Sequence, residues 1–197
     1  RDVGLDTVSF EEGIKNALRQ APNIVVIGEI RSSKVMKQAM ACVETGHLCL
    51  ATIHANNSYQ AIDRMLHFFP PDQRAQLLMD LSLNIRAIVG QQLIESRDES
   101  SVHPAVEILL NSPLVAGLIK NGKTDEIQEA IGKSGECGMQ TFDQSLCDLY
   151  DAKKITYEKA LLHATSANNL RLALKFKNSK PLNNEGLDFG SLTVSED

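Results

Sequence analysis

The chain has 197 residues, 43% of them hydrophobic, and its 20 basic and 25 acidic residues give a formal net charge of −5. This acidic balance argues against a general nucleic-acid-binding surface, and no stretch approaches the ~20 apolar residues that a membrane-spanning helix needs. The length suffices for one well-formed core or one and a half domains, and four cysteines without a Cys-x-x-Cys pair predict reduced, buried thiols in a cytosolic protein.

An apolar run at residues 24–27, Ile-Val-Val-Ile, is the first clear strand. It has no polar face, so we predict a central strand that is covered by helices on both faces. Gly28 follows and would let the backbone approach a phosphate, and Glu29 would emerge where open α/β sheets bind ligands. A carboxylate there can orient a water molecule or the hydration shell of magnesium. The alternative is that Glu29 is an ordinary surface acid at the start of the next helix.

A second apolar strand is predicted at residues 48–53, and His54 follows it directly. Between the two strands, residues 33–44 carry apolar side chains at helical spacing. Such a strand-helix-strand unit makes its two strands parallel and usually near neighbours. We therefore expect Glu29 and His54 to emerge at the same edge of the sheet and to form one site.

His47 precedes the second strand and needs a separate interpretation. About six residues at roughly 3.3 Å each would place it about 20 Å from His54, at the opposite edge of the sheet. There it would be a polar group at the start of the strand or in a subunit contact. A metallohydrolase built on Glu29, His47 and His54 is a further alternative, but it requires the two histidines to lie within about 4 Å of each other.

The rest of the chain is predicted to be helical, apart from one hairpin. We predict helices over residues 10–20, 58–67, 72–92, 124–133, 142–151, 157–163 and 168–176, a further helix that begins at Pro113, and two strands joined by the polar loop 95–104. From residue 178 onward the sequence lacks periodicity, and we expect a mobile tail. These elements suggest three regions, at 1–111, 112–177 and 178–197.

Two motifs resemble those of a known family. Gly-Glu-Ile-Arg at 28–31, followed by Glu-Thr-Gly-His-Leu-Cys-Leu-Ala-Thr-Ile-His at 44–54, is similar to the Walker B and His-box motifs of hexameric secretion-type ATPases. Residues 113–119 and Gly-Met-Gln-Thr-Phe-Asp-Gln-Ser-Leu at 138–146 resemble the type IV pilus retraction motors of the PilT/PilU family, and this half is more similar to PilU. The resemblance spans about residues 1–175. It implies an α/β fold: a partial RecA-like P-loop ATPase core with a parallel sheet, followed by a C-terminal helical bundle.

The resemblance also implies roles for single residues. Glu29 matches the Walker B acid, which in such motors holds the water shell of Mg²⁺ and polarises the attacking water. His54 matches the His-box residue that senses the terminal phosphate of ATP, and His47 matches the other His-box histidine. Gly28 and Arg31 belong to the family's Gly-Glu-x-Arg-Asp motif. We therefore expect Gly28, Arg31 and His47 to contact the nucleotide, and Glu29 and His54 to take part in hydrolysis.

The sequence departs from the family pattern in two ways. Ser32 stands where the aspartate of that motif is usual, so an ion pair made by the aspartate is not expected here. No Gly-x-x-x-x-Gly-Lys-Ser/Thr occurs, and neither the upstream acidic box nor the domain that carries the arginine fingers is found. We therefore expect these 197 residues to be the C-terminal portion of a longer motor protein, which would bind ATP weakly or not at all by themselves.

The predicted function is that of a cytoplasmic, hexameric motor subunit that uses ATP and Mg²⁺ to power pilus retraction and twitching motility at the inner membrane. Expected partners are further copies of the chain, a PilT-like motor and the inner-membrane platform protein of the pilus, but not nucleic acid. Ala116 and Asn121 replace an arginine and an acid of the PilT-like stretch, which favours an auxiliary, PilU-like motor. The alternatives are a non-catalytic adaptor of a PilT-like motor and a related secretion or assembly ATPase. Those ATPases typically have a four-cysteine metal module after the His box, which this chain lacks.

Overall fold

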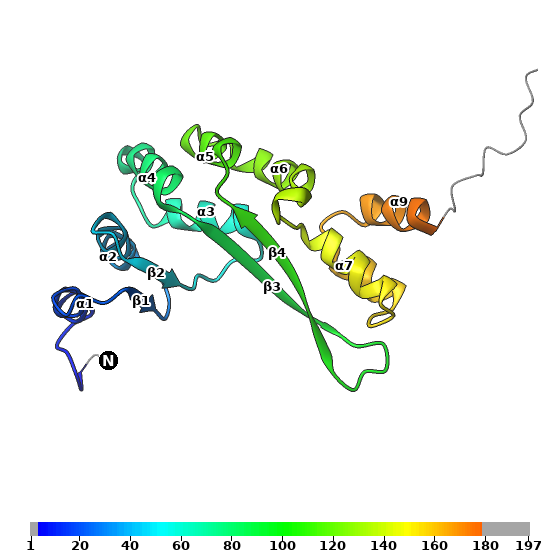
Figure 1. The fold of residues 1–197 in the computed structure, drawn as a ribbon, viewed down its shortest axis with the longest axis horizontal. Helices are drawn as coiled ribbons and strands as arrows, with labels where there is room; N and C mark the ends of the chain where they lie inside the picture. Colours follow the sequence, from blue (N-terminus) through cyan, green and yellow to red (C-terminus); the bar gives the residue numbers. More distant parts are fainter. Residues whose placement is uncertain (1–3, 179–197) are drawn as a thin grey trace, which may run out of the picture.

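The structure is a computed structural model that describes residues 4–178, and its elements follow one another along an elongated molecule (Figure 1). In chain order they are α1 (Phe10–Leu18), β1 (Ile24–Ile27), α2 (Ser33–Glu44), β2 (Leu48–Ala51), α3 (Ser58–His67), α4 (Pro71–Asn84), β3 (Ala87–Glu95), β4 (Val102–Leu110), α5 (Pro113–Lys120), η1 (Thr124–Glu126), α6 (Ile127–Lys133), η2 (Gly135–Cys137), α7 (Phe142–Asp151), α8 (Tyr157–His163) and α9 (Ala167–Asn178). Residues 179–197, most of the predicted tail, lie outside the described residues. Within the described part of the chain, no helix is long and apolar enough to cross a membrane.

The amino-terminal part contains the predicted strand-helix-strand unit. β1 and β2 pair in parallel along their whole length, with Ile27 opposite Ala51. The connecting helix α2 is capped by Ser32, whose hydroxyl accepts a hydrogen bond from the Val35 N–H. Capping of this kind satisfies one of the N–H groups that a helix start leaves without an acceptor. The parallel pairing is confirmed, and it brings the carboxyl ends of both strands to one edge.

The prediction that the first strand is covered on both faces is wrong for the described chain. Val25 and Ile27 are buried, with 8% and 2% exposure, but Val26 is 72% exposed. The buried side chains pack with Met36 of α2 in one hydrophobic cluster. The sheet has only two strands in the described residues, and its other face is uncovered there. β2 also ends at Ala51, earlier than the predicted residue 53.

A long hairpin replaces the end of the helix predicted at 72–92. Helix α4 ends at Asn84 and β3 begins at Ala87, so the prediction is wrong from residue 85 onward. The apolar residues after Asn84 fit both a helical and an extended pattern. Antiparallel pairing, which places Ala87 opposite Leu110, stabilises the extended form. The predicted hairpin itself is confirmed, with longer strands and a shorter loop than expected.

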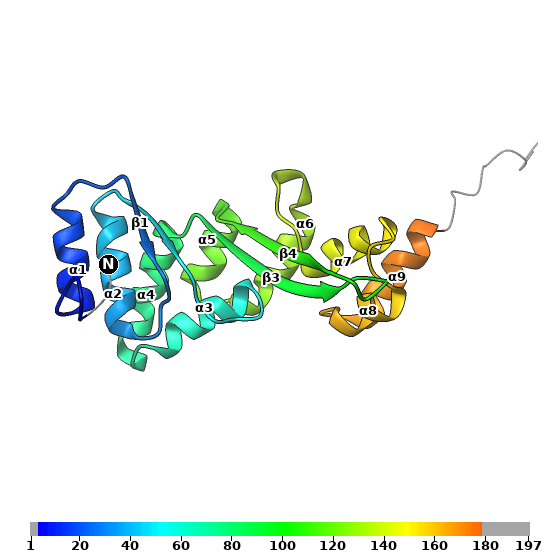
Figure 2. The same cartoon turned by 90° about the horizontal axis from the view of Figure 1, so that it is seen from below.

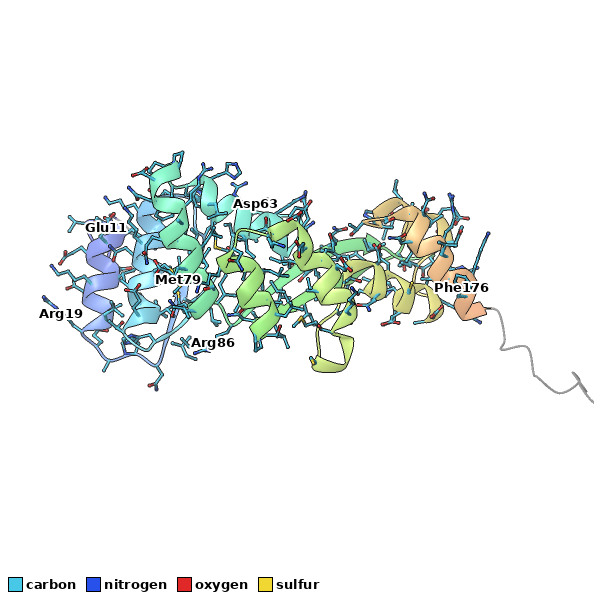
Figure 3. The ribbon with its side chains drawn as sticks, turned by 90° about the horizontal axis from the view of Figure 1, so that it is seen from above. Glu11, Arg19, Asp63, Met79, Arg86 and Phe176 are labelled. Carbon is cyan, nitrogen blue, oxygen red and sulfur yellow. The ribbon has the colours of Figure 1, made fainter. Side chains whose placement is uncertain are left out.

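The remaining helices lie close to their predicted positions. α3, α7 and α8 match the predicted ranges, α5 begins at Pro113, and α1 ends at Leu18 instead of residue 20. The helix predicted at 124–133 is divided into the 3-10 turn η1 and α6. Asp63, labelled on α3 in Figure 3, accepts a hydrogen bond from the Thr124 hydroxyl at 3.0 Å. This bond ties α3 to η1.

Two hydrophobic clusters lie along the molecule. The first includes Ile27 and Leu109, and the second includes Phe142 and Leu170. Figure 2 shows α7, α8 and α9, which contribute most of the second cluster, at the end of the molecule opposite α1, and the hairpin adds Ile94 and Ala105 to this cluster. Helices α5 and α6 contribute buried residues to the first cluster, so the predicted boundary after residue 111 does not coincide with the division between the clusters. The fold is α/β, with a parallel pair of strands followed by a helical region, as predicted.

Candidate active site

The carboxyl ends of β1 and β2 stay joined after the regular strands end. The Thr52 hydroxyl donates a hydrogen bond to the Gly28 carbonyl oxygen, and the Ile30 N–H donates to the Thr52 carbonyl oxygen at 2.9 Å. These bonds fix the two chain segments against each other. The side chains of Glu29 and His54 therefore leave the sheet next to each other.

The predicted meeting of Glu29 and His54 is confirmed. Oε1 of Glu29 lies 3.1 Å from Nε2 of His54. Oε2 accepts a hydrogen bond from Nε of Arg31 at 2.5 Å and forms an ion pair with the same guanidinium group. The Glu29 side chain is 17% exposed, whereas those of Arg31 and His54 are each 76% exposed. The carboxylate thus lies between two polar side chains that remain accessible to a ligand.

The surroundings of Glu29 keep its carboxylate ionised. The hydrogen bond from Arg31 lowers its pKa most, and electrostatic interactions with Arg31, His54 and Arg64 also lower it, whereas partial burial acts in the opposite direction. Glu29 in turn raises the pKa of Arg31. A carboxylate with a lowered pKa is a weaker proton acceptor, but it still binds water and the hydration shell of a cation. The electrostatics therefore favour a role in orienting water.

His47 does not join this group. It lies just before β2, where its Nδ1 is 3.0 Å from the Thr45 hydroxyl and 3.2 Å from the Cys42 carbonyl oxygen. His54 lies beyond the other end of the same strand. In the described residues, no group of three or more His, Cys, Asp and Glu side chains is placed to hold a metal ion, so the alternative of a metallohydrolase has no geometric support.

The sequence of the chain matches a known protein family. The family described as Type II/IV secretion system protein matches residues 4–186 of the chain. The chain belongs to this family. The match includes Glu29 and His54, as well as the helices of both hydrophobic clusters.

Members of the Type II/IV secretion system family from pilus systems are the most informative relatives. The chain is 55% identical over 175 residues to the type IV pilus ATPase PilU of Pseudomonas aeruginosa, which covers 89% of the chain and 46% of PilU. It is 34% identical over 160 residues to the retraction ATPase PilT of the same organism, which covers 81% of the chain and 46% of PilT. The chain thus spans about half the length of the curated relatives it matches. The predicted resemblance to the PilT/PilU family is confirmed.

Two solved structures agree with the fold. A crystal structure of the pilus retraction motor PilT with bound ADP has a TM-score of 0.78 at 30% identity, covering 87% of this chain and 48% of that chain. The ATPase DotB of Legionella pneumophila has a TM-score of 0.70 at 22% identity, covering 82% of this chain and 43% of that chain, which supports the fold alone.

Two further polar residues of the structure, Arg64 and Glu107, were not predicted from the sequence. Arg64, on α3, is one of the positive charges that lower the pKa of Glu29. Glu107, in β4, is 1% exposed and accepts two hydrogen bonds from Ser58 at the start of α3. A signal existed for Glu107, because it is a single acid inside the apolar run 105–110. Its partner could not be predicted, because nothing local relates β4 to α3.

Proposed function

We propose that this chain is part of a hexameric ATPase subunit that powers type IV pilus retraction, and thereby twitching motility, at the cytoplasmic face of the inner membrane. The similarity to PilU and to PilT supports this proposal. The observation that carries it is the 3.1 Å contact between Glu29 and His54 at the carboxyl ends of two parallel strands. Open α/β sheets bind their ligands at this edge.

In this proposal, Glu29 orients the water molecule that attacks the terminal phosphate of ATP. Arg31 holds Oε2 of the carboxylate, so Oε1 faces His54. The exposed imidazole of His54 binds either Glu29 or the terminal phosphate, and loss of the phosphate returns it to the carboxylate. This exchange of partners would report hydrolysis to the segment after His54, which leads into α3.

The residues at this edge fit a nucleotide that carries Mg²⁺. A Cβ atom placed on Gly28 would meet no atom within 4 Å, so a phosphate has space to approach the backbone beside Glu29. Mg²⁺ usually keeps several waters and binds one or two carboxylates together with substrate phosphates. Glu29 would hold Mg²⁺ through water, and the metal would neutralise charge on the phosphates. Arg31 would contact the nucleotide at the same edge, whereas His47, at the other end of β2, remains a polar group at the start of that strand.

The proposed partners are further copies of the chain, a PilT-like motor and the inner-membrane platform protein of the pilus. Helix α5 begins the stretch that resembles the retraction motors, and Leu114 on it is 57% exposed. Asn121, which replaces an acid, donates its side-chain amide to the Gly117 carbonyl oxygen at 2.8 Å and caps the helix end. Lost charges alter partner contacts more than folding. The loss of this charge also favours a second candidate, a non-catalytic subunit that contributes only contacts to a PilT-like motor.

Glu29→Gln in the full-length protein tests the catalytic proposal. Glutamine keeps the size and one acceptor oxygen but removes the negative charge, so the rate of ATP hydrolysis should fall about 100-fold or more while nucleotide binding is retained. Glu129→Gln is a matched control, because Glu129 is an exposed acid of α6 that pairs with Lys133. Unchanged hydrolysis in Glu29→Gln contradicts the catalytic role.

A mixing experiment separates the two candidates. The full-length protein is combined with a PilT-like motor, and the Walker B acid of each protein is removed in turn. If Glu29 is catalytic, its removal lowers the ATPase activity of the mixture. If the protein contributes only contacts, removal of the partner's acid abolishes activity and removal of Glu29 changes nothing.

A further inference from the structure

A buried carboxylate joins the start of α3 to the long hairpin. Glu107 lies in β4, and its Oε1 accepts hydrogen bonds from both the N–H and the hydroxyl of Ser58, each at 2.7 Å. Glu107 is 1% exposed and Ser58 is 2% exposed. Ser58 is the first residue of α3 and follows His54 after a connection of three residues. The carboxylate therefore fixes one end of the segment that carries His54.

The local sequence supplies a different cap to the same helix. Asn57 accepts a hydrogen bond from the Gln60 N–H at 3.0 Å, as an ordinary N-cap residue does. That bond secures the first turn of α3 but does not attach it to the rest of the molecule. Glu107, 49 residues further along the chain, provides the attachment, and its negative charge suits the positive end of the helix dipole.

Burial of the Glu107 carboxylate costs free energy, which the contact with Ser58 has to offset. Its second oxygen, Oε2, is buried and has no hydrogen-bond partner in the described residues. Burial of a charged group with an unsatisfied oxygen is unfavourable. Filling this space alone would not require a charge. The position of Glu107 is therefore better explained by the two bonds it makes to Ser58.

The strand that carries Glu107 is also bonded to α7 and to the segment that leads into it. The Val106 N–H donates to the Ser145 hydroxyl at 3.0 Å. Ile108 and Gln140 exchange two backbone hydrogen bonds, at 2.8 and 3.0 Å. Figure 1 shows α3 and α7 both beside the hairpin. Neighbouring residues of one strand thus hold α3 through a side chain and the start of α7 through the backbone.

We propose that Glu107 is a positioning residue. It fixes residues 54–58, the His54 segment, against β4 and so links this segment to α7. Its significance for hydrolysis rests on the proposed function of His54, whereas the link itself does not. Glu107 does not touch the reacting atoms in this proposal. It acts through Ser58, by restricting where the segment between His54 and α3 can lie.

Hydrogen exchange on the whole protein tests the link without reference to ATP. Glu107→Ala should speed amide exchange in residues 54–60 at least tenfold and should also speed exchange in residues 140–147. Glu107→Gln keeps one acceptor oxygen for Ser58 and should restore most of the protection. Unchanged exchange in residues 54–60 of Glu107→Ala would overturn the proposal. If that variant does not fold, Ser58→Ala removes the hydroxyl bond alone and should give a smaller acceleration in the same segments.

A matched control separates this link from general loosening of the hairpin. Asn111 follows β4 directly, and its side-chain amide donates to the Ser82 and Ile85 carbonyl oxygens, each at 2.9 Å. Asn111→Ala therefore removes partly buried polar bonds at the end of β4, away from the His54 segment. It should leave exchange in residues 54–60 unchanged. Acceleration equal to that of Glu107→Ala would show general destabilisation and overturn the proposal.

A double-mutant cycle on ATP hydrolysis tests the consequence for His54. Glu107→Ala should lower kcat about tenfold with less than a twofold change in KM, and it should have no further effect when His54 is already Ala, because coupled residues are not additive. Additive effects would overturn the link to His54. If His54→Ala alone leaves kcat unchanged, the proposed function fails, while the exchange experiment still decides whether Glu107 holds the segment.

Discussion

Gly90→Ala tests how closely the hairpin packs against α7. Gly90 lies in β3 opposite Glu107, and a Cβ atom added there would lie 2.9 Å from Cζ and 3.2 Å from Cε2 of Phe142. Phe142 is 1% exposed and belongs to the second hydrophobic cluster, so its ring has little room to move. Overpacking of this kind destabilises by about 1–3 kcal/mol, and each kcal/mol lowers the melting temperature of a domain of this size by about 2–4 °C.

Gly117→Ala is the matched control for this substitution. Gly117 lies inside α5, and a Cβ atom added there would meet no atom within 4 Å. Alanine is more stable than glycine in a helix interior by roughly 0.5–1 kcal/mol, so this variant should melt higher than the parent chain. Thermal unfolding followed by circular dichroism compares the two variants. A Gly90→Ala protein that melts at or above the parent temperature refutes the packing argument.

Three further predictions concern charge and burial. Arg31→Ala should raise the pKa of Glu29 towards its ordinary value of 4.5, as measured by NMR titration of its side-chain carboxyl carbon, because the largest influence that lowers it is removed. The pKa of Asp98 is lowered from 3.8 to about 2 by hydrogen bonds from Ser96 and Ser100, so its stabilising effect is present above pH 3.8 and is lost as the pH falls towards 2. Denaturant titrations of Asp98→Asn should lack this part of the pH dependence. Ile27→Ala should cost about 2–5 kcal/mol in the free energy of unfolding, whereas Val26→Ala should stay within about 0.5 kcal/mol, because the two side chains are 2% and 72% exposed.

The edge that carries Glu29 and His54 could be predicted because it depends on local patterns and on topology. Two apolar runs separated by an amphipathic helix require a parallel pair of strands, and the residues that follow parallel strands meet at one edge. The contact between Glu29 and His54 needs no detailed knowledge of packing. The separate position of His47 follows from the length of the strand between the two histidines.

Features that depend on distant contacts could not be predicted in the same way. The apolar residues after Asn84 fit a helix as well as a strand, and pairing with β4 decides between them. Exposure of Val26 depends on what covers the sheet, which the strand sequence itself does not contain. The burial of Glu107 depends on which face of β4 is covered and on Ser58, a partner 49 residues away.

Ser32 lies close in sequence to the edge that carries Glu29 and His54. Ser32 caps α2 through its hydroxyl and carries no charge, so Arg31 has no carboxylate beside it in the sequence. The Arg31 guanidinium pairs with Glu29, contacts one of the two carboxylate oxygens and lowers the pKa of that carboxyl. The other oxygen faces His54. Arg31 and His54 thus hold the orientation of the carboxylate, and the lone pairs that they do not use can accept hydrogen bonds from water.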